Sequence, residues 1–393
     1  MTIWNNIPTR VGTNSVKWDL AETIYKTDGP LLPMWVADMD FRVAPSIERA
    51  LQQRLDHGVF GYSSPSEHSK QLLQQWLETS HRWTIDPALL SFHQGVLPAI
   101  AASIETFSEE GDEVVITSPV YPPFRSIPEQ LDRRVVDCPL IENDGTYEID
   151  FNALERAFQT AKLFIFCNPH NPGGTVWREE DIRTLTKLAA REKVVLLSDE
   201  IHSDLVYEPN EHVPTARVNE AGASIITFVA PTKTFNLAGI QIAASIASTI
   251  DLKRALDRTT QSHMTMGPNA FALAAWDAAY GDPESNEWLS EMKSLIQRNE
   301  SFITERLLEA FPHLRIAPLQ STYLLWIDYR AYELKERDVM DALLQVGRLA
   351  LEPGSKYGEA GDGFLRLNLA TSEQLIEEAV DRFIESFKSL LAP

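Results

Sequence analysis

The sequence is poor in cysteine and in positive charge, and it lacks long apolar runs. Two cysteines in 393 residues cannot build a disulfide framework or a cysteine-rich zinc site. Lysine and arginine number 35 against 56 acidic residues, a net charge of −21, which argues against a nucleic-acid-binding or membrane-surface protein. No apolar run reaches the roughly 18 residues of a membrane span, and the polar N-terminus lacks the apolar core of a signal peptide. We therefore expect a cytoplasmic protein.

Several well-known catalytic and nucleotide-binding motifs are also missing from the sequence. There is no Walker loop, no G-x-G-x-x-G, no G-x-S-x-G and no H-E-x-x-H. These absences argue against a nucleotide-binding loop, a serine-hydrolase elbow and a zinc-protease helix.

The apolar pattern of residues 89–248 is typical of an α/β protein. Short, β-branched-rich runs alternate with amphipathic helical patterns at 96–107, 151–160 and 178–192. Continuous apolar runs are expected for strands that are buried on both faces. The pattern predicts a mostly parallel, seven-stranded sheet covered by helices, with strands at 89–93, 113–117, 134–138, 162–167, 194–198, 224–230 and 241–248.

The pattern changes after residue 283 and predicts a smaller α+β domain. Helices are expected at 286–311 and 336–345, and strands at 323–328 and 363–369. A last helix should begin at Thr371 as N-cap, with Gln374 completing a capping box. We predict three segments: an N-terminal arm (1–45) that packs with the small domain or a second subunit, a large domain (46–283) and a small domain (284–393).

Four features lie at the ends of predicted strands, where open α/β sheets bind their ligands. Gly95 precedes an apolar helix whose first N–H groups could hold an anion. Asn171, Asp199 and Lys233 follow three later strands, and each alone could be a turn, a helix cap or a surface residue. Together they match the needs of pyridoxal phosphate, namely a lysine for the Schiff base and an acid that keeps the pyridine nitrogen protonated.

The motifs around these residues resemble those of a known family. They are PMWVADMDF (33–41), FGY (60–62), SPVYPPF (118–124), CNPHNPGG (167–174), SDEIHSDLV (198–206), TKTFNLAG (232–239) and FLRLNLA (364–370). The chain resembles the fold-type-I pyridoxal-phosphate enzymes, the aspartate aminotransferase superfamily, over essentially its whole length. Within that group it is similar to the cystathionine β-lyase, or C–S lyase, branch of MalY/PatB type. The resemblance implies the PLP-dependent transferase fold and a homodimer with composite active sites.

The resemblance also implies roles for the residues at the strand ends. Lys233 would be the Schiff-base lysine and the base that takes the substrate Cα proton, and Asp199 would pair with the pyridinium nitrogen. Asn171 and His202 would contact the phenolic oxygen of the cofactor. His202 could instead be a core histidine, or a metal ligand together with Asp199 and Asp204, but we predict no metal site.

Further residues complete the predicted cofactor site. By resemblance, Tyr121 would stack on the cofactor ring and take part in catalysis, although an aromatic residue there could also be core packing. Gly95 and Val96 would offer N–H groups to the phosphate, and Thr232 a hydroxyl. Tyr62 would reach the phosphate bound by the neighbouring subunit, unless it is a buried turn tyrosine.

The substrate side of the site is predicted around Arg366. An arginine in an apolar run is costly to bury unless paired, and its fork suits a carboxylate, so Arg366 should clamp the substrate α-carboxylate. Trp35, Asp38 and Tyr121 would line the same end. One position departs from the aminotransferase pattern: Gln241 stands where an arginine usually holds the phosphate, a loss that the lyase branch shares.

The resemblance implies α,β-elimination from an amino-acid substrate. Cystathionine would yield homocysteine, pyruvate and ammonia, and cysteine S-conjugates would yield their thiol. One alternative is an aminotransferase that uses the same lysine, acid and arginine. A second alternative is a regulatory or binding protein that keeps the scaffold.

Overall fold

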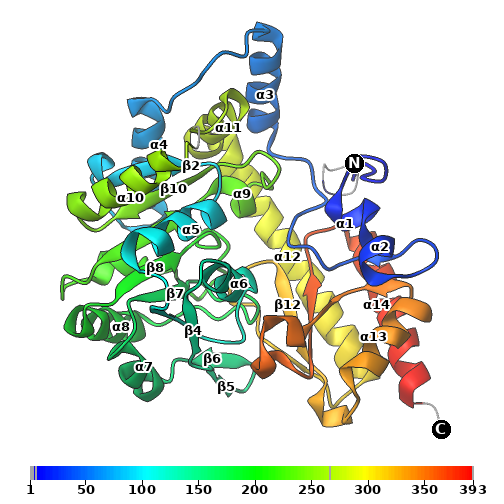
Figure 1. Cartoon of the computed structure of the whole chain (residues 1–393). Coiled ribbons are helices and arrows are strands. Elements are labelled where there is room, and N and C mark those ends of the chain that lie inside the picture. Colours follow the sequence, from blue (N-terminus) through cyan, green and yellow to red (C-terminus); the bar gives the residue numbers. More distant parts are fainter. Residues whose placement is uncertain (1–3, 5–6, 265–266, 392–393) are drawn as a thin grey trace.

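The computed structural model describes residue 4 and residues 7–264 and 267–391. Its larger part is built on a seven-stranded sheet with the strand order β2-β10-β9-β8-β7-β3-β4 (Figure 1). The predicted mostly parallel sheet is confirmed, and β10 is the one strand that runs antiparallel to its neighbours. The strands are β2 (Leu90–His93), β3 (Glu113–Ile116), β4 (Arg134–Asp137), β7 (Leu163–Cys167), β8 (Val195–Asp199), β9 (Ile225–Val229) and β10 (Ala243–Ala247).

Strand β7 shows why these runs are continuously apolar. Leu163 and Ile165 pack with α5 (Val96–Phe107) and α10 (Ile250–Ser262) on one face of the sheet. Phe164 and Phe166 pack with α7 (Phe151–Phe158) and α8 (Glu179–Glu192) on the other face. Because successive strand residues point to opposite faces, a sheet covered on both sides favours apolar residues at successive positions instead of an alternation of apolar and polar ones.

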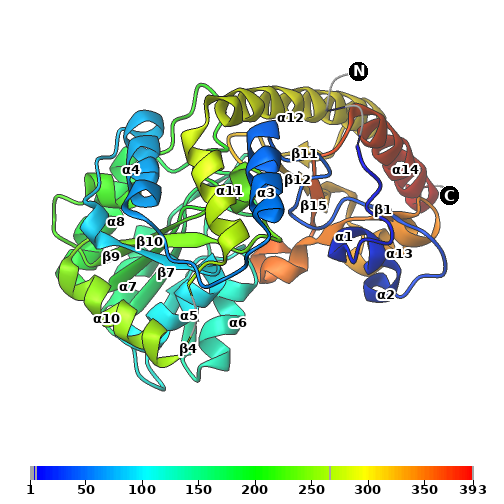
Figure 2. The ribbon, with the colours of Figure 1, turned by 90° about the horizontal axis from the view of Figure 1, so that it is seen from above.

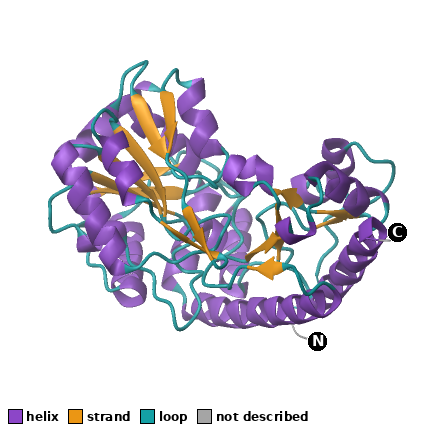
Figure 3. Cartoon of the chain, turned by 90° about the horizontal axis from the view of Figure 1, so that it is seen from below, coloured by secondary structure: helices purple, strands orange, loops and turns teal. Residues whose placement is uncertain are grey.

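The C-terminal part forms a second, smaller sheet. Its order is β11-β12-β15-β14, with β11 (Arg315–Ile316), β12 (Leu324–Asp328), β15 (Phe364–Asn368) and β14 (Glu352–Pro353). The helices α12 (Pro283–Ala310), α13 (Glu336–Gln345) and α14 (Glu373–Leu391) cover it, and α12 runs as one long rod along the molecule (Figures 2 and 3). The two groups of strands are well separated in Figure 3.

The prediction that Thr371 caps the last helix is wrong. Helix α14 begins at Glu373, and the hydroxyl of Ser372 accepts the hydrogen bond from the amide of Leu375. The buried hydroxyl of Thr371 has no partner among the described residues. The capping register is therefore shifted by one residue, a difference that spacing alone does not resolve.

The N-terminal arm lies against the smaller part of the molecule. Helices α1 (Val16–Asp19) and α2 (Ala21–Tyr25) lie beside α13 in Figure 2, and β1 (Leu32–Pro33) pairs in parallel with β13 (Leu349–Ala350). The boundaries predicted at 45 and 283 stay predictions, and residues 1–3, 5–6 and 392–393 of the outer segments lie outside the described residues.

The apolar pattern of residues 45–57 predicts a helix, and α3 confirms it, whereas the other helices named in this paragraph and the hairpin were not predicted as separate elements. Helices α3 (Pro45–His57), α4 (Glu67–His81) and α11 (Ala270–Gly281) pack together beside the large sheet, α6 (Pro123–Gln130) follows β3, and β5 (Ile141–Asn143) forms a hairpin with β6 (Thr146–Glu148). Within the described residues no helix is both long and apolar enough to cross a membrane.

Candidate active site

The residues predicted at the strand ends meet in one cavity. Asp199 is the last residue of β8, Asn171 follows β7, and Lys233 lies in α9 (Pro231–Thr234), directly after β9. Parallel strands bring their carboxyl ends to one edge of the sheet, and the loops there form the cavity. Its volume is about 670 Å³, and its lining includes Trp35, Gly95, Val96, Tyr121, Asn171, Asp199, His202, Thr232, Lys233 and Arg366.

Lys233 is held in the cavity by a backbone group. Its Nζ donates a hydrogen bond to the carbonyl oxygen of Ala37, 2.6 Å away. Burial and the nearby Arg366 guanidinium lower the pKa of Lys233 to about 8, against the opposing effects of Asp38 and Asp199. A lysine with a pKa this close to neutrality can exchange a proton with a substrate far more readily than a surface lysine.

Asp199 lines the cavity and is buried. It accepts a hydrogen bond from the amide of Ile201 at 3.1 Å, and burial raises its pKa to about 7. The hydrogen bond from Ile201 and the charge of Lys233 oppose this rise but do not cancel it. Next to it, burial lowers the pKa of His202 to about 3, and the Nδ1 atom of His202 has no hydrogen-bond partner among the described residues.

Arg366 lies in the middle of β15 with only 3% of its surface exposed. Its Nη1 donates to Oδ1 of Asn171 at 3.2 Å, and its Nη2 donates to the carbonyl of Trp35 at 2.9 Å. Nη2 also lies 3.2 Å from Oε2 of Glu352. The Nε–H is buried without a described partner, so the guanidinium keeps an unused donor.

One wall of the cavity can take an anion. Gly95 is the N-cap of α5, and Gly95, Val96 and Leu97 line the cavity where the first N–H groups of a helix lack partners within that helix. Thr232 and Gln241 lie in the same lining. Tyr121 lines it as well, and burial raises the pKa of its phenol, so it is a neutral aromatic wall at physiological pH.

Two residues that were predicted to belong to the site do not line the cavity. Tyr62 does not line this cavity, and 96% of its surface is exposed, so the alternative of a buried turn tyrosine is wrong. Asp38 does not line the cavity either, because its carboxylate is engaged with Arg10 at 2.6 Å. The expectation that Asp38 lines the substrate end is therefore corrected, whereas Trp35 of the same motif does line it.

The metal alternative for His202 finds no support in the described residues. The Asp204 carboxylate accepts hydrogen bonds from Trp76, His81 and Thr234. No three histidine, cysteine, aspartate or glutamate side chains of the described chain are grouped to hold a metal ion.

Sequence reasoning missed Glu352 and Lys356, which also line the cavity. Glu352 accepts hydrogen bonds from the Tyr357 hydroxyl at 2.5 Å and from the Lys356 ammonium. The signal was present in the sequence: Glu352 is a lone acid in the apolar run 349–353, and a buried acid needs partners. The carbonyl of Ala37 was missed as well, and no side-chain pattern could have indicated it.

The fold and the cavity define a doubly wound α/β enzyme scaffold with its site at the carboxyl edge of the sheet. Residues 32–383 match the model of the family "Aminotransferase class I and II", so the chain belongs to that family.

Relatives and solved structures agree with this assignment. The chain is 40% identical to the cystathionine beta-lyase PatB of Bacillus subtilis (strain 168), over 95% of this chain and 96% of that protein. Cystalysin from Treponema denticola, which contains a pyridoxal 5′-phosphate cofactor, superposes with a TM-score of 0.94 at 30% identity, over 98% of both chains. The PLP-bound C–S lyase from Staphylococcus hominis gives a TM-score of 0.89 at 27% identity, over 98% of this chain and 97% of that one.

Proposed function

We propose that this protein is a pyridoxal-phosphate-dependent carbon–sulfur lyase that cleaves cystathionine or related cysteine S-conjugates. The observation that carries the proposal is the convergence of Lys233, Asp199, Asn171 and Arg366 on one cavity. The similarity to cystathionine beta-lyase PatB and to a C–S lyase supports this choice of reaction within the family. A cytoplasmic location stays a prediction.

The cofactor is pyridoxal 5′-phosphate, and the residues of the cavity fit it. Asp199 is a buried acid whose raised pKa would return toward its ordinary value beside a protonated pyridine nitrogen. The unpartnered Nδ1 of His202 is available to a polar group on the ring. The N-terminus of α5 offers donors to a phosphate, and Tyr121 offers an aromatic face. Lys233 would hold the aldehyde carbon.

Arg366 would bind and orient the substrate. Its free Nε–H can donate to one oxygen of an α-carboxylate, and Nη2 can turn the N–H that faces Glu352 to the other oxygen while it keeps its bond to the Trp35 carbonyl. A carboxylate fixed at this point would hold the rest of the substrate in the cavity that Lys233 also lines. Fixing the substrate in this way supplies much of the rate, because the reacting groups no longer have to find one another.

Lys233 would move the proton. Its amine, with a pKa of about 8, takes the proton from Cα, and the bond between Cβ and sulfur then breaks with its electron pair leaving on sulfur. The bound cofactor supplies an electron-accepting ring that stabilises the negative charge at Cα. The thiolate takes up a proton, and one water is consumed as the three-carbon fragment yields pyruvate and ammonia.

A second candidate reaction is transamination, which the family itself favours because it is named for aminotransferases. Transamination needs the same lysine, acid and arginine, and differs in returning the proton to the cofactor and in requiring a 2-oxo acid. Gln241 replaces the arginine expected of a typical aminotransferase at that position, which supports the lyase.

We also propose a homodimer with composite sites. Tyr62 belongs to a group of exposed apolar side chains that includes Val59 and Phe60, and Phe60 stacks on Phe271 with a centroid distance of 5.5 Å. An exposed apolar group of this kind is typical of a contact surface. In the composite site that the resemblance implies, a second copy covering this group would receive the Tyr62 hydroxyl at its phosphate.

The test is the release of pyruvate and free thiol from L-cystathionine by the cofactor-loaded protein, without any 2-oxo acid. Release of both products in equal amounts is expected. No release, together with turnover that appears only after a 2-oxo acid is added, would overturn the lyase and favour the aminotransferase.

A further inference from the structure

Backbone carbonyl groups of residues 35–37 contact the two most important side chains of the cavity. The carbonyl of Trp35 accepts the hydrogen bond from Nη2 of Arg366 at 2.9 Å. The carbonyl of Ala37 accepts the hydrogen bond from Nζ of Lys233 at 2.6 Å, and another from the Tyr323 hydroxyl at 2.9 Å. The positions of the proposed base and the proposed carboxylate clamp therefore both depend on where this segment lies.

The segment itself has no regular secondary structure to fix it, since residues 34–44 form neither helix nor strand. The Asn368 amide donates to the carbonyls of Val36 and Asp38, both at 2.6 Å. Asn236 bonds to the backbone of Met39. These contacts fix the segment to the end of β15 and to the loop after α9.

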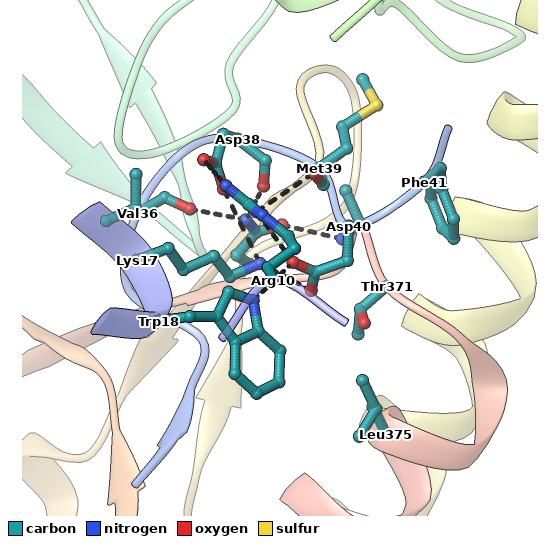
Figure 4. Close-up of polar contacts among 12 residues, drawn as sticks. Arg10, Lys17, Trp18, Val36, Asp38, Met39, Asp40, Phe41, Thr371 and Leu375 are labelled. Atoms are coloured by element: carbon teal, nitrogen blue, oxygen red, sulfur yellow. Dashed lines mark hydrogen bonds and ion pairs between the residues drawn. The ribbon is translucent and has the colours of Figure 1, made fainter. Parts of the chain in front are cut away.

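The segment is also held by ion pairs with residues 10–18, which lie nearer the start of the N-terminal arm (Figure 4). Arg10 contacts Asp38 at 2.6 Å and Asp40 at 2.9 Å, and Lys17 contacts Asp40 at 2.8 Å. The indole N–H of Trp18 donates to Asp40 at 2.9 Å. Two cations from residues 10–17 and two anions of the segment thus balance one another in a compact cluster.

The cluster is buried enough to matter energetically. The side chains of Lys17 and Asp40 are fully buried, and those of Arg10 and Asp38 are only 21% and 18% exposed. Burial opposes the charge of Asp40, but the Lys17 ammonium and hydrogen bonds from Lys17, Trp18 and Arg10 hold the pKa of that carboxyl below its usual range. Removing one partner from such a cluster leaves an uncompensated charge, which the segment would relieve by moving.

We propose that the start of the N-terminal arm positions the catalytic groups: Arg10, acting through Asp38 and Asp40, sets where the carbonyls of Trp35 and Ala37 hold Arg366 and Lys233. Arg10 touches no reacting atom and is a positioning residue. The proposal rests on the proposed function only in assigning proton transfer at Cα to Lys233.

The test uses the cofactor-loaded protein and follows one proton. L-Alanine has no leaving group on Cβ, so exchange of its α-proton in deuterated water reports proton transfer by Lys233 without any elimination. Loss of the α-proton signal is followed by NMR for the wild type, Arg10→Gln, Arg10→Lys and Asp38→Asn. The melting temperature and the absorbance of the bound cofactor are recorded for each variant.

In Arg10→Gln, exchange should slow by about 10- to 100-fold while the cofactor stays bound, since displacement by about 1 Å has effects of this size. Arg10→Lys should recover part of the lost rate because it keeps a cation at that point. The Arg10→Gln and Asp38→Asn effects should be strongly non-additive, because the two residues form one contact.

Arg42→Gln is the matched control. Arg42 belongs to the same stretch of chain, but it pairs with Glu48 at the surface, with both side chains about half exposed. Its exchange rate should stay within about twofold of the wild type. The same result for Arg10→Gln, with a lower melting temperature, would overturn the proposal and leave the cluster a purely structural role.

If Arg10→Gln does not fold or does not bind cofactor, Arg10→Lys and Asp38→Asn decide by the same criterion. Failure of the proposed function looks different: the wild type would exchange the alanine proton but release no thiol from L-cystathionine.

Discussion

The Nη2 atom of Arg366 and the Oε2 atom of Glu352 lie 3.2 Å apart in the wall of the catalytic cavity. The proposed clamp for the substrate carboxylate therefore already has a carboxylate beside it. Glu352 compensates the buried cation before substrate arrives. The Tyr357 hydroxyl donates to the same Oε2 atom, and the Lys356 ammonium binds Oε1. The pair stabilises the ligand-free cavity at the expense of its attraction for an anion.

Glu352→Gln should therefore change affinity and stability in opposite directions. The KM for L-cystathionine should fall by roughly three- to tenfold, because Arg366 would lose a competing anion. The free energy of unfolding should fall by about 1 to 3 kcal/mol, because Arg366, Lys356 and Tyr357 would lose a charged acceptor. Steady-state kinetics and urea titration measure the two effects. Glu359→Gln, an exposed acid of the same loop, serves as control, and a higher KM in Glu352→Gln would contradict this view.

Lys233→Ala should abolish proton transfer and covalent capture of the cofactor together. Pyruvate release should fall by at least about 10²- to 10⁴-fold, the usual contribution of a general base. Borohydride treatment of the wild type should fix the cofactor to the peptide that contains Lys233, as seen by mass spectrometry. Lys187→Ala removes an exposed lysine of α8 and should leave both results unchanged. Fixation on another lysine in the wild type would refute the assignment.

The buried carboxyl of Asp199 should make the cofactor-free protein sensitive to pH. Its pKa is raised from 3.8 to about 7, so over that interval the unfolded state is ionised while the folded state keeps its proton. Folding then takes up a proton, and stability falls as the pH rises through the interval.

Asp199→Asn should remove this dependence. The variant should gain stability over the wild type between about pH 5 and about pH 8, with a ceiling on the order of 4 kcal/mol. Thermal unfolding of both cofactor-free proteins measures the difference, and Asp341→Asn, at an exposed position, controls for loss of charge. If the difference in stability between Asp199→Asn and the wild type were the same at about pH 5 and about pH 8, the raised pKa assigned to Asp199 would be contradicted. The loaded Asp199→Asn enzyme should be strongly impaired, because the ring nitrogen would lose its counter-charge.

Composite sites predict recovery of activity in mixed dimers. Tyr62→Ala and Lys233→Ala should each be impaired as homodimers. In a mixed dimer, one site would combine the intact Lys233 of one chain with the intact Tyr62 of the other and should regain activity. Co-expression with two affinity tags and assay of the doubly purified fraction measure this. If the purified mixed dimer were no more active than the Tyr62→Ala homodimer, Tyr62 would not belong to the active site of the neighbouring chain.

Much of the fold could be predicted because the large sheet has a strong signature in the sequence. Strands β7, β8 and β9 are mostly apolar, and Asn171, Asp199 and Lys233 lie at or just after their carboxyl ends. Parallel strands bring successive chain ends to one edge, so order along the sequence became proximity in space. The helix cap at Ser372 was missed because neighbouring hydroxyl residues offer the same chemistry, and only the backbone conformation selects between them.

The sequence by itself determined the sheet, the chemistry of its edge and the family to which the chain belongs. These follow from local patterns, since apolar periodicity and side-chain type are properties of the residues themselves. Only the tertiary structure decided that Asp38 faces Arg10, that Glu352 faces Arg366 and that the carbonyl of Ala37 receives Lys233. None of these contacts follows from a local pattern, because the partners lie on different elements, up to 196 residues apart for Lys233 and Ala37, and the sequence does not indicate which side chain a backbone carbonyl will bind.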